Sequence, residues 1–139
     1  MKAIIDTLHA GNYSCVIRNG ETRTYTRRGV ADLYELLKTD PLFLRGASVA
    51  DKVVGKGAAA LMVLGGIKEL YTDVISTPAL ELLDRAGIGI LHREVVPAIR
   101  NRDNTGFCPL ETRCLHEDTA EKLLPVIEDF IESMKNRQK

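Results

Sequence analysis

The sequence predicts an α/β fold, a three-layer sandwich in which helices cover both faces of a mixed five-stranded sheet. One observation is a β-hairpin pattern near the N-terminus, "SCVIRNGETRTYT". Another is that runs with strand character alternate with runs with helical character along the rest of the chain, which is typical of parallel strands joined by crossover helices. With 139 residues and no linker-like segment, the chain is expected to form a single domain over residues 1–139.

The first elements are a short helix and the hairpin. Lys2–His9 places its apolar residues on one face and is followed by Gly11, so it is expected to be helical. The hairpin strands alternate in polarity on both sides of Asn19-Gly20, a pair that favours a type I′ turn with two positive φ angles.

The middle of the chain supplies two helices and a strand. Val30–Lys38 carries an apolar stripe at helical spacing and stops at Asp40-Pro41. Ala47–Val54 is expected to be a strand. Lys56–Leu64 is almost wholly apolar and Ala-rich, and it ends at Gly65-Gly66, which predicts a buried helix.

Further strands and helices complete the expected sheet. Leu70–Ile75 and Ile88–Glu94 have strand character, and the helix between them begins at Pro78 after a Ser76 or Thr77 cap. A last helix follows Asp118 in a capping-box-like start, and Pro125 is expected to interrupt it unless the helix begins nearer to that residue.

Bulk properties argue against several function classes. Nineteen basic and nineteen acidic residues cancel, and the chain holds only seven aromatic residues, so no nucleic-acid partner is expected. No apolar run reaches the roughly 18 residues of a membrane span. The polar residues Asp6 and His9 come too early for a signal peptide, and three cysteines do not suggest a disulfide framework. A cytoplasmic protein with no membrane partner is the expectation.

A ligand site is expected at the carboxyl ends of the parallel strands, where helix N-termini point and α/β sheets bind their ligands. The residues that this edge would gather are Arg27, Arg28, Asp51, Lys52, Gly55, Lys56, Ser76 and Thr77.

Asp51 and Lys52 interrupt a strand that is expected to be buried on both faces. Neighbouring strand residues point to opposite faces, so these two side chains cannot simply pair with each other. Two interpretations stay open. The two residues lie at the rim of a pocket with Lys56, or the strand ends early and leaves them solvated or locally paired.

The run Gly55-Lys56-Gly57 precedes the Ala-rich helix. It lacks the G-x-x-x-x-G-K-S/T pattern of a nucleotide-binding P-loop. A lysine at a helix N-terminus nevertheless suits an anion, because free N–H groups and the helix dipole favour negative charge there. The alternative is that the glycines serve a tight turn and close packing, which we favour for Gly57.

Cysteine and histidine residues near the C-terminus raise the question of a metal. Cys108, Cys114 and His116 have no standard zinc spacing and lack an evident fourth ligand, so no metal is predicted. Cys108-Pro109 is more typical of a turn with a packed thiol, and the residues before it are expected to form a loop of Asx turns.

The chain resembles a small prokaryotic family of unknown function with a cytidine-deaminase-like fold. The resemblance extends from Cys15 to Glu111 and rests on three blocks, "VADKVVGKGAAALMVLGG", "VISTPALELLDRAGI" and "NRDNTGFCPLE". It implies the hairpin, helix, strand, helix, strand, helix, strand order of that fold. It brings no established activity.

The resemblance to deaminases stops at their zinc site. Deaminases place a His/Cys-Ala-Glu motif on the helix after the hairpin and Pro-Cys-x-x-Cys on the helix after the next strand. This chain has "RRGVADL" and "VVGKGAA" at those positions, with no thiol, imidazole or glutamate. Zinc-dependent deamination is therefore excluded.

Two functions remain open. In the first, the protein binds a small anionic or nucleotide-like ligand. Arg28, Lys52 and Lys56 would hold its charge, and Asp51 or Asp103 would orient it or transfer a proton. The loop from Asn101 to Gly106 would fold over the pocket edge, with Arg102 or Asp103 completing the site. In the second, the protein is a non-catalytic interaction module.

The sequence assigns no catalytic residue and no cofactor, so whether the protein is an enzyme stays open. A homo-oligomer formed through the hairpin edge or the Ala-rich helix is plausible.

Overall fold

The computed structural model describes residues 1–27, 30–99 and 108–137. The strands are β1 (Cys15–Asn19), β2 (Glu21–Tyr25), β3 (Ser48–Val54), β4 (Glu69–Ser76) and β5 (Gly89–Val96). The helices are α1 (Lys2–Ala10), α2 (Ala31–Thr39), α3 (Pro41–Leu44), α4 (Lys56–Gly65), α5 (Thr77–Arg85), α6 (Pro109–Cys114) and α7 (Ala120–Arg137).

The five strands form one mixed sheet in the order β2-β1-β3-β4-β5. β1 is antiparallel to β2 and to β3, whereas β3, β4 and β5 are parallel. A parallel pair needs a crossover connection, and α4 and α5 provide the two that the sequence predicted. The α/β class and the mixed five-stranded sheet are therefore confirmed, and the last strand is longer than expected.

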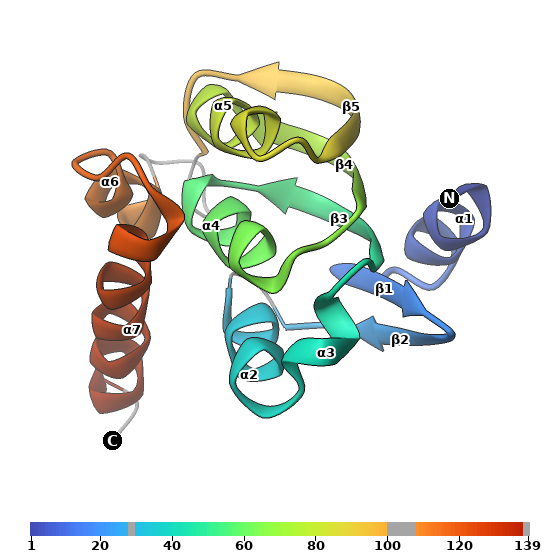
Figure 1. Ribbon diagram of the computed structural model, residues 1–139, viewed down its shortest axis with the longest axis horizontal. Coiled ribbons are helices and arrows are strands. Elements are labelled where there is room, and N and C mark those ends of the chain that lie inside the picture. Colours follow the sequence, from blue (N-terminus) through green and yellow to red (C-terminus); the bar gives the residue numbers. More distant parts are fainter. Residues whose placement is uncertain (28–29, 100–107, 138–139) are drawn as a thin grey trace.

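Helices cover the two faces of the sheet unequally. On one face α1 packs Ile4 and Leu8 against Val16, Ala50 and Tyr71. The other face is covered by α2, α4 and α5, with α7 outside α4. Figure 1 shows α1 and α7 at opposite ends of the molecule. Over β4 and β5, beyond the reach of α1, no described element covers this face of the sheet.

Helix α4 occupies the centre of the larger layer. Its residues from Ala59 to Met62 are fully buried, because α2, α5 and α7 surround it. This burial follows from a sequence with no polar stripe. The Ala-rich helix therefore does not offer a free face for oligomer formation, and that expectation is corrected.

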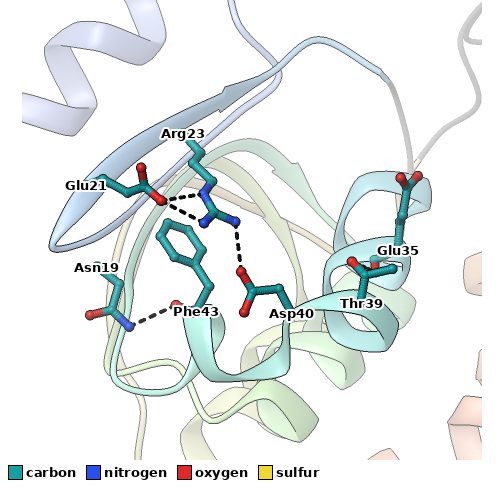
Figure 2. A network of polar contacts seen from close by, with 7 residues as sticks. All are labelled: Asn19, Glu21, Arg23, Glu35, Thr39, Asp40 and Phe43. Carbon is teal, nitrogen blue, oxygen red and sulfur yellow. Dashed lines mark hydrogen bonds and ion pairs between the residues drawn. The ribbon is translucent and has the colours of Figure 1, made fainter.

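The hairpin turn differs from its predicted form. A type I′ turn needs positive φ angles at both Asn19 and Gly20. Gly20 has a φ of +80°, but the φ of Asn19 is not positive, so the turn is not type I′. The Asn19 side-chain amide instead donates hydrogen bonds of 2.9 Å to the carbonyl groups of Phe43 and Arg45. These bonds connect the hairpin to α3, a helix that the sequence did not predict (Figure 2).

The side chain of Arg23 connects β2, the outer strand of the hairpin, to the same short helix. The Arg23 guanidinium lies 3.8 Å from the centroid of the Phe43 ring and forms ion pairs with Glu21 at 2.6 Å and Asp40 at 3.2 Å (Figure 2). A charged and covered edge of this kind resists pairing with another strand. The interactions hold β2 against α3.

The alternation of side chains changes phase midway along β3. Asp51 and Val54 both lie on the face of the larger core. In a regular strand, residues three positions apart would lie on opposite faces. Lys52 and Val53 both turn away from that core, and the strand pairing omits the row that contains Lys52, Asp73 and Arg93. The irregularity places Val53 on the open face of the sheet.

Helix α7 begins at Ala120 and runs through Pro125 without interruption, so of the two alternatives that the sequence left open the interruption is not observed. Its N-terminus is capped by Thr119 rather than Asp118, since the Thr119 Oγ1 accepts a hydrogen bond of 3.2 Å from the Lys122 N–H. Pro125 lies early in the helix and removes a single i→i−4 bond, which the packing of Leu123 and Ile127 in the core offsets. No helix in the described part of the chain has the length and hydrophobicity to cross a membrane.

Candidate functional site at the carboxyl edge of the sheet

The carboxylate of Glu111 lies where the carboxyl ends of β3 and β4 meet α4 and α5. Its Oε2 accepts hydrogen bonds from the Lys56 backbone N–H at 2.7 Å and from the Ser76 hydroxyl at 2.6 Å. Its Oε1 accepts a 2.6 Å bond from the Ile99 N–H. The side chain is 3% exposed, so these three donors replace the water that the carboxylate has lost.

An anion therefore does bind at the N-terminus of α4, but it belongs to the chain itself. A free backbone N–H in the first turn of a helix attracts negative charge, and Glu111 supplies that charge from α6. Ser76 extends the arrangement, because its hydroxyl also accepts the Ala79 N–H at 3.3 Å as the N-cap of α5. One carboxylate thus connects the starts of two helices.

The glycines on either side of Lys56 allow α6 to come close. A Cβ on Gly55 would lie 2.9 Å from the Glu111 Oε2, and a Cβ on Gly57 would lie 2.7 Å from the Leu110 Cδ2. Gly57 therefore serves close packing, as the sequence analysis favoured. Gly55 makes room for the carboxylate.

The Lys56 side chain does not face this anion. Its ammonium donates a 2.6 Å hydrogen bond to the Glu117 carbonyl in the connection between α6 and α7, and the residue is 6% exposed. At this position the backbone N–H holds negative charge, whereas the ammonium anchors the C-terminal segment.

A groove of about 420 Å³ opens beside this cluster on the face of the sheet that α1 leaves free. Its walls come from the carboxyl ends of three adjacent parallel strands and the residues that follow the last of them. The lining residues are Val53, Val74, Glu94, Val96, Pro97, Ala98 and Ile99. Ile99 lies between the groove and Glu111: the residue lines the groove, and its backbone N–H donates a hydrogen bond to the Glu111 carboxylate.

Asp51 faces the interior and is paired across the sheet with Cys15. Burial raises the pKa of the Asp51 carboxyl to about 7, although hydrogen bonds from the backbone at Val53 and Lys52 and from the Cys15 thiol work in the opposite direction. Burial, together with the nearby charges of Asp51 and Asp32, also raises the pKa of Cys15 well above its ordinary value. Asp51 is thus a buried acid beneath the sheet edge and does not line the groove.

Lys52 points to the opposite side of β3, as alternation requires. Its ammonium donates a 2.7 Å hydrogen bond to the Asn12 side chain in the turn after α1. The same side carries Asp73, which binds His9 at 2.9 Å and the Tyr71 hydroxyl at 2.5 Å. Lys52 and Lys56 therefore bind partners on different sides of the sheet.

The predicted site residues thus divide into three groups. Gly55 and Lys56 come together with Ser76 around Glu111. Asp51 and Lys52 lie on the two faces of β3. Arg28, Arg102 and Asp103 lie outside the described residues.

The other two residues expected at this edge, Arg27 and Thr77, bind partners within the chain. Arg27 is bound to the acidic residues Asp32 and Glu35 of α2, at 2.6 and 2.7 Å. Thr77 donates a 3.3 Å bond to the Val96 carbonyl at the end of β5.

The cysteines have structural positions. Cys114 is fully buried in the main core, where burial raises the pKa of its thiol to about 11, and Cys108 precedes α6 as its N-cap residue. The sequence predicted a turn at Cys108-Pro109 and missed the short helix that starts there. In the described part of the chain, no three His, Cys, Asp or Glu side chains gather as metal ligands.

The residue that sequence reasoning missed is Glu111. The available signal was local: Pro109 is favoured at the first position of a helix, which predicts α6 with Glu111 in its first turn. No pattern in the sequence indicates that this carboxylate would lie at the start of α4, 55 residues earlier in the chain.

Comparisons with known proteins agree with the fold. A family model described as "TM1506: Domain of unknown function (DUF1893)" matches residues 3–131. A crystal structure of a DUF1893 family protein (TM1506) from Thermotoga maritima is similar to this chain, with a TM-score of 0.85 and 26% sequence identity. The match covers 92% of this chain and 87% of that one. No curated protein matches. The chain belongs to the DUF1893 family, a domain family of unknown function.

Proposed function

We propose that this protein binds a small molecule in the groove at the carboxyl edge of β3, β4 and β5. The observation that carries the proposal is the position of the groove, since ligands of open α/β sheets bind beyond the carboxyl ends of parallel strands. Its volume of about 420 Å³ falls within the range of small-molecule sites. The lining is mostly apolar, and Val53 is 47% exposed, so a ligand would bury apolar surface that now faces water.

We further propose that the scaffold is of the cytidine-deaminase type. The observed order of hairpin, α2, β3, α4, β4, α5 and β5 supports this assignment, with α3 as a short insertion before β3. In that scaffold the helices after the hairpin and after the next strand carry the zinc ligands, and here those helices begin with Ala31 and Lys56. The proposed activity is therefore binding, without zinc-dependent deamination.

The test is a ligand screen with a variant in which the groove is filled. Thermal unfolding of the wild type is measured with nucleosides, nucleotides, small carboxylates and small amines, and Val53→Trp is measured in parallel. A ligand present at about 100 times its Kd stabilises a protein by about 2.7 kcal/mol, which raises the Tm by several degrees in a domain of this size. We expect Val53→Trp to lose the shift.

Leu42→Trp is the matched control, because Leu42 is 73% exposed on α3 and lies outside the groove lining. It should keep the full shift. A ligand shift that survives Val53→Trp would move the site away from the groove. Absence of a shift with every compound class would favour the alternative, a non-catalytic interaction module.

An anionic ligand is a second candidate, and the Glu111 carboxylate favours it. Three donors already hold an anion at the start of α4, so a carboxylate or phosphate group could bind there if Glu111 moved out. The variant Glu111→Ala vacates the position. If acetate or phosphate at millimolar concentration stabilises Glu111→Ala and leaves the wild type unchanged, the position accepts free anions. If neither anion stabilises the variant, Glu111 is only a structural link.

A further inference from the structure

We propose that the groove selects a ligand that joins an apolar body to a cationic amino group, with Glu94 as the residue that recognises the amine. This inference rests on the proposed binding function, and it replaces the anionic ligand expected from the sequence with one of opposite charge for this groove. The charge of the preferred ligand follows from which charged side chains face the groove and which lie outside it.

Glu94 provides the charge of the groove. Among the described residues that line it, the other members are Val, Pro, Ala and Ile, so Glu94 is the one ionisable side chain. Glu94 lies in register with Val74, which is in register with Val53, and this row therefore places the carboxylate beside two apolar walls. None of the ion pairs in the described part of the chain involves the Glu94 carboxylate.

The two cations of the adjacent row, Lys52 and Arg93, are not among the residues that line the groove. The Lys52 ammonium is bound to the Asn12 side chain. Arg93 faces Tyr71 and Asp73: burial works to raise the pKa of Asp73, but hydrogen bonds from Tyr71 and His9 and the charges of His9 and Arg93 outweigh it and lower that pKa. Neither cation lines the groove, and no described lining residue would give an anion a positive charge to offset Glu94.

The apolar walls of the groove indicate the apolar body of the ligand. Val53, Val74 and Val96 project from three neighbouring strands, and Pro97 and Ile99 continue the surface beyond β5. Such a surface binds a branched aliphatic or aromatic group by burying it from water. The ammonium of the ligand would then reach the Glu94 carboxylate at the rim, where a charge-assisted hydrogen bond fixes its orientation.

The experiment uses three probes that share one apolar body, namely 2-phenylethylamine, 2-phenylethanol and 3-phenylpropanoate. Binding to the full chain is followed by the NMR shifts of the backbone amides of Val53, Val74 and Ala98. We expect the amine to bind roughly fivefold more tightly than the alcohol, which corresponds to an ion pair worth about 1 kcal/mol at a partly exposed site, and the carboxylate to bind most weakly. Glu94→Gln should remove the preference, and Glu94→Lys should reverse it.

Glu81→Lys is the matched control. Glu81 is exposed on α5, which packs on the other face of the sheet, so this variant changes the net charge by the same amount without altering the groove. It should keep the preference for the amine.

The outcomes separate the two proposals. Equal binding of all three probes, lost in Val53→Trp, would overturn the selection of amines and leave the binding site intact. A preference that Glu94→Lys does not change would overturn the role of Glu94. If no probe shifts the groove amides at tens of millimolar, the amine ligand class is overturned, and the proposed function is judged separately by the broader ligand screen with Val53→Trp.

Discussion

The Glu111 carboxylate lies 2.7 Å from the backbone N–H of Lys56, so α6 supplies the anion that the N-terminus of α4 attracts. The pair joins two segments that are far apart in the chain, and the Ser76 hydroxyl binds the same oxygen. The position that an external anion would take is therefore part of the folded structure.

The first prediction concerns the stability that this carboxylate provides. Glu111→Ala removes the partner of three donors, two of which lie in a buried environment, and hydrogen bonds to charged groups contribute about 1.5–3 kcal/mol each. We expect a loss of at least about 3 kcal/mol in the free energy of unfolding, measured by urea denaturation. Glu111→Gln, which keeps one acceptor oxygen, should lose about half as much. Glu81→Ala on the surface of α5 is the control, and an equal effect of the two alanine variants would contradict the prediction.

A second prediction concerns Gly55, whose missing side chain makes room for Glu111. Gly55→Ala would place a Cβ 2.9 Å from the Glu111 Oε2 and 3.3 Å from the Ile99 Cγ1, and we expect a destabilisation of about 1–3 kcal/mol. In a double-mutant cycle the effect should largely disappear in the Glu111→Ala background, because the oxygen that clashes is gone. Gly89→Ala, where a Cβ would meet nothing closer than 4.0 Å, serves as the control. Additive effects of the two substitutions would show that Gly55 matters for another reason.

The third prediction follows from the buried acid on β3. The pKa of Asp51 is raised to about 7 in the folded protein, against about 3.9 in an unfolded chain. Between these values the folded state holds a proton that the unfolded state releases. Asp51 therefore lowers stability as pH rises from about 4 to 7, by about 1.4 kcal/mol per pH unit.

The isosteric variant Asp51→Asn does not titrate, so it isolates this effect. Relative to the wild type, Asp51→Asn should become progressively more stable between about pH 4 and pH 7 in urea unfolding. Asp84→Asn, at an exposed position on α5, should run parallel to the wild type. Parallel curves for Asp51→Asn as well would mean that the carboxyl titrates at its ordinary pKa.

The fourth prediction concerns thiol reactivity. Burial raises the pKa of Cys15 and of Cys114, so both thiols stay protonated and are shielded at neutral pH. Cys108 is partly exposed at the start of α6 and should react first with iodoacetamide, as measured by peptide mass spectrometry. Cys15 and Cys114 should react only in denaturant. Rapid labelling of Cys114 in the native protein would show that α6 separates from the core.

Local patterns were sufficient to predict most of the fold. The apolar run from Lys56 predicted α4, and the Ser76 cap with Pro78 predicted the start of α5, because capping and hydrophobic periodicity act within a few residues. The two short helices were missed for the same reason. α3 and α6 have four and six residues, too few for a periodic pattern to develop, and each is stabilised by contacts with distant parts of the chain.

The sequence by itself determined the α/β class, the order of the strands and the longer helices, the lack of the deaminase zinc motifs, and the preference for negative charge at the start of α4. Only the tertiary structure decided that Glu111 supplies this charge, that Lys52 and Lys56 bind on different sides of the sheet, and that the open groove carries Glu94. The physical reason is the range of the interactions. Helix and strand preferences depend on residues that are neighbours in the sequence. The candidate site depends on contacts between distant segments, here the irregularity in β3 and the packing of α6 against the start of α4.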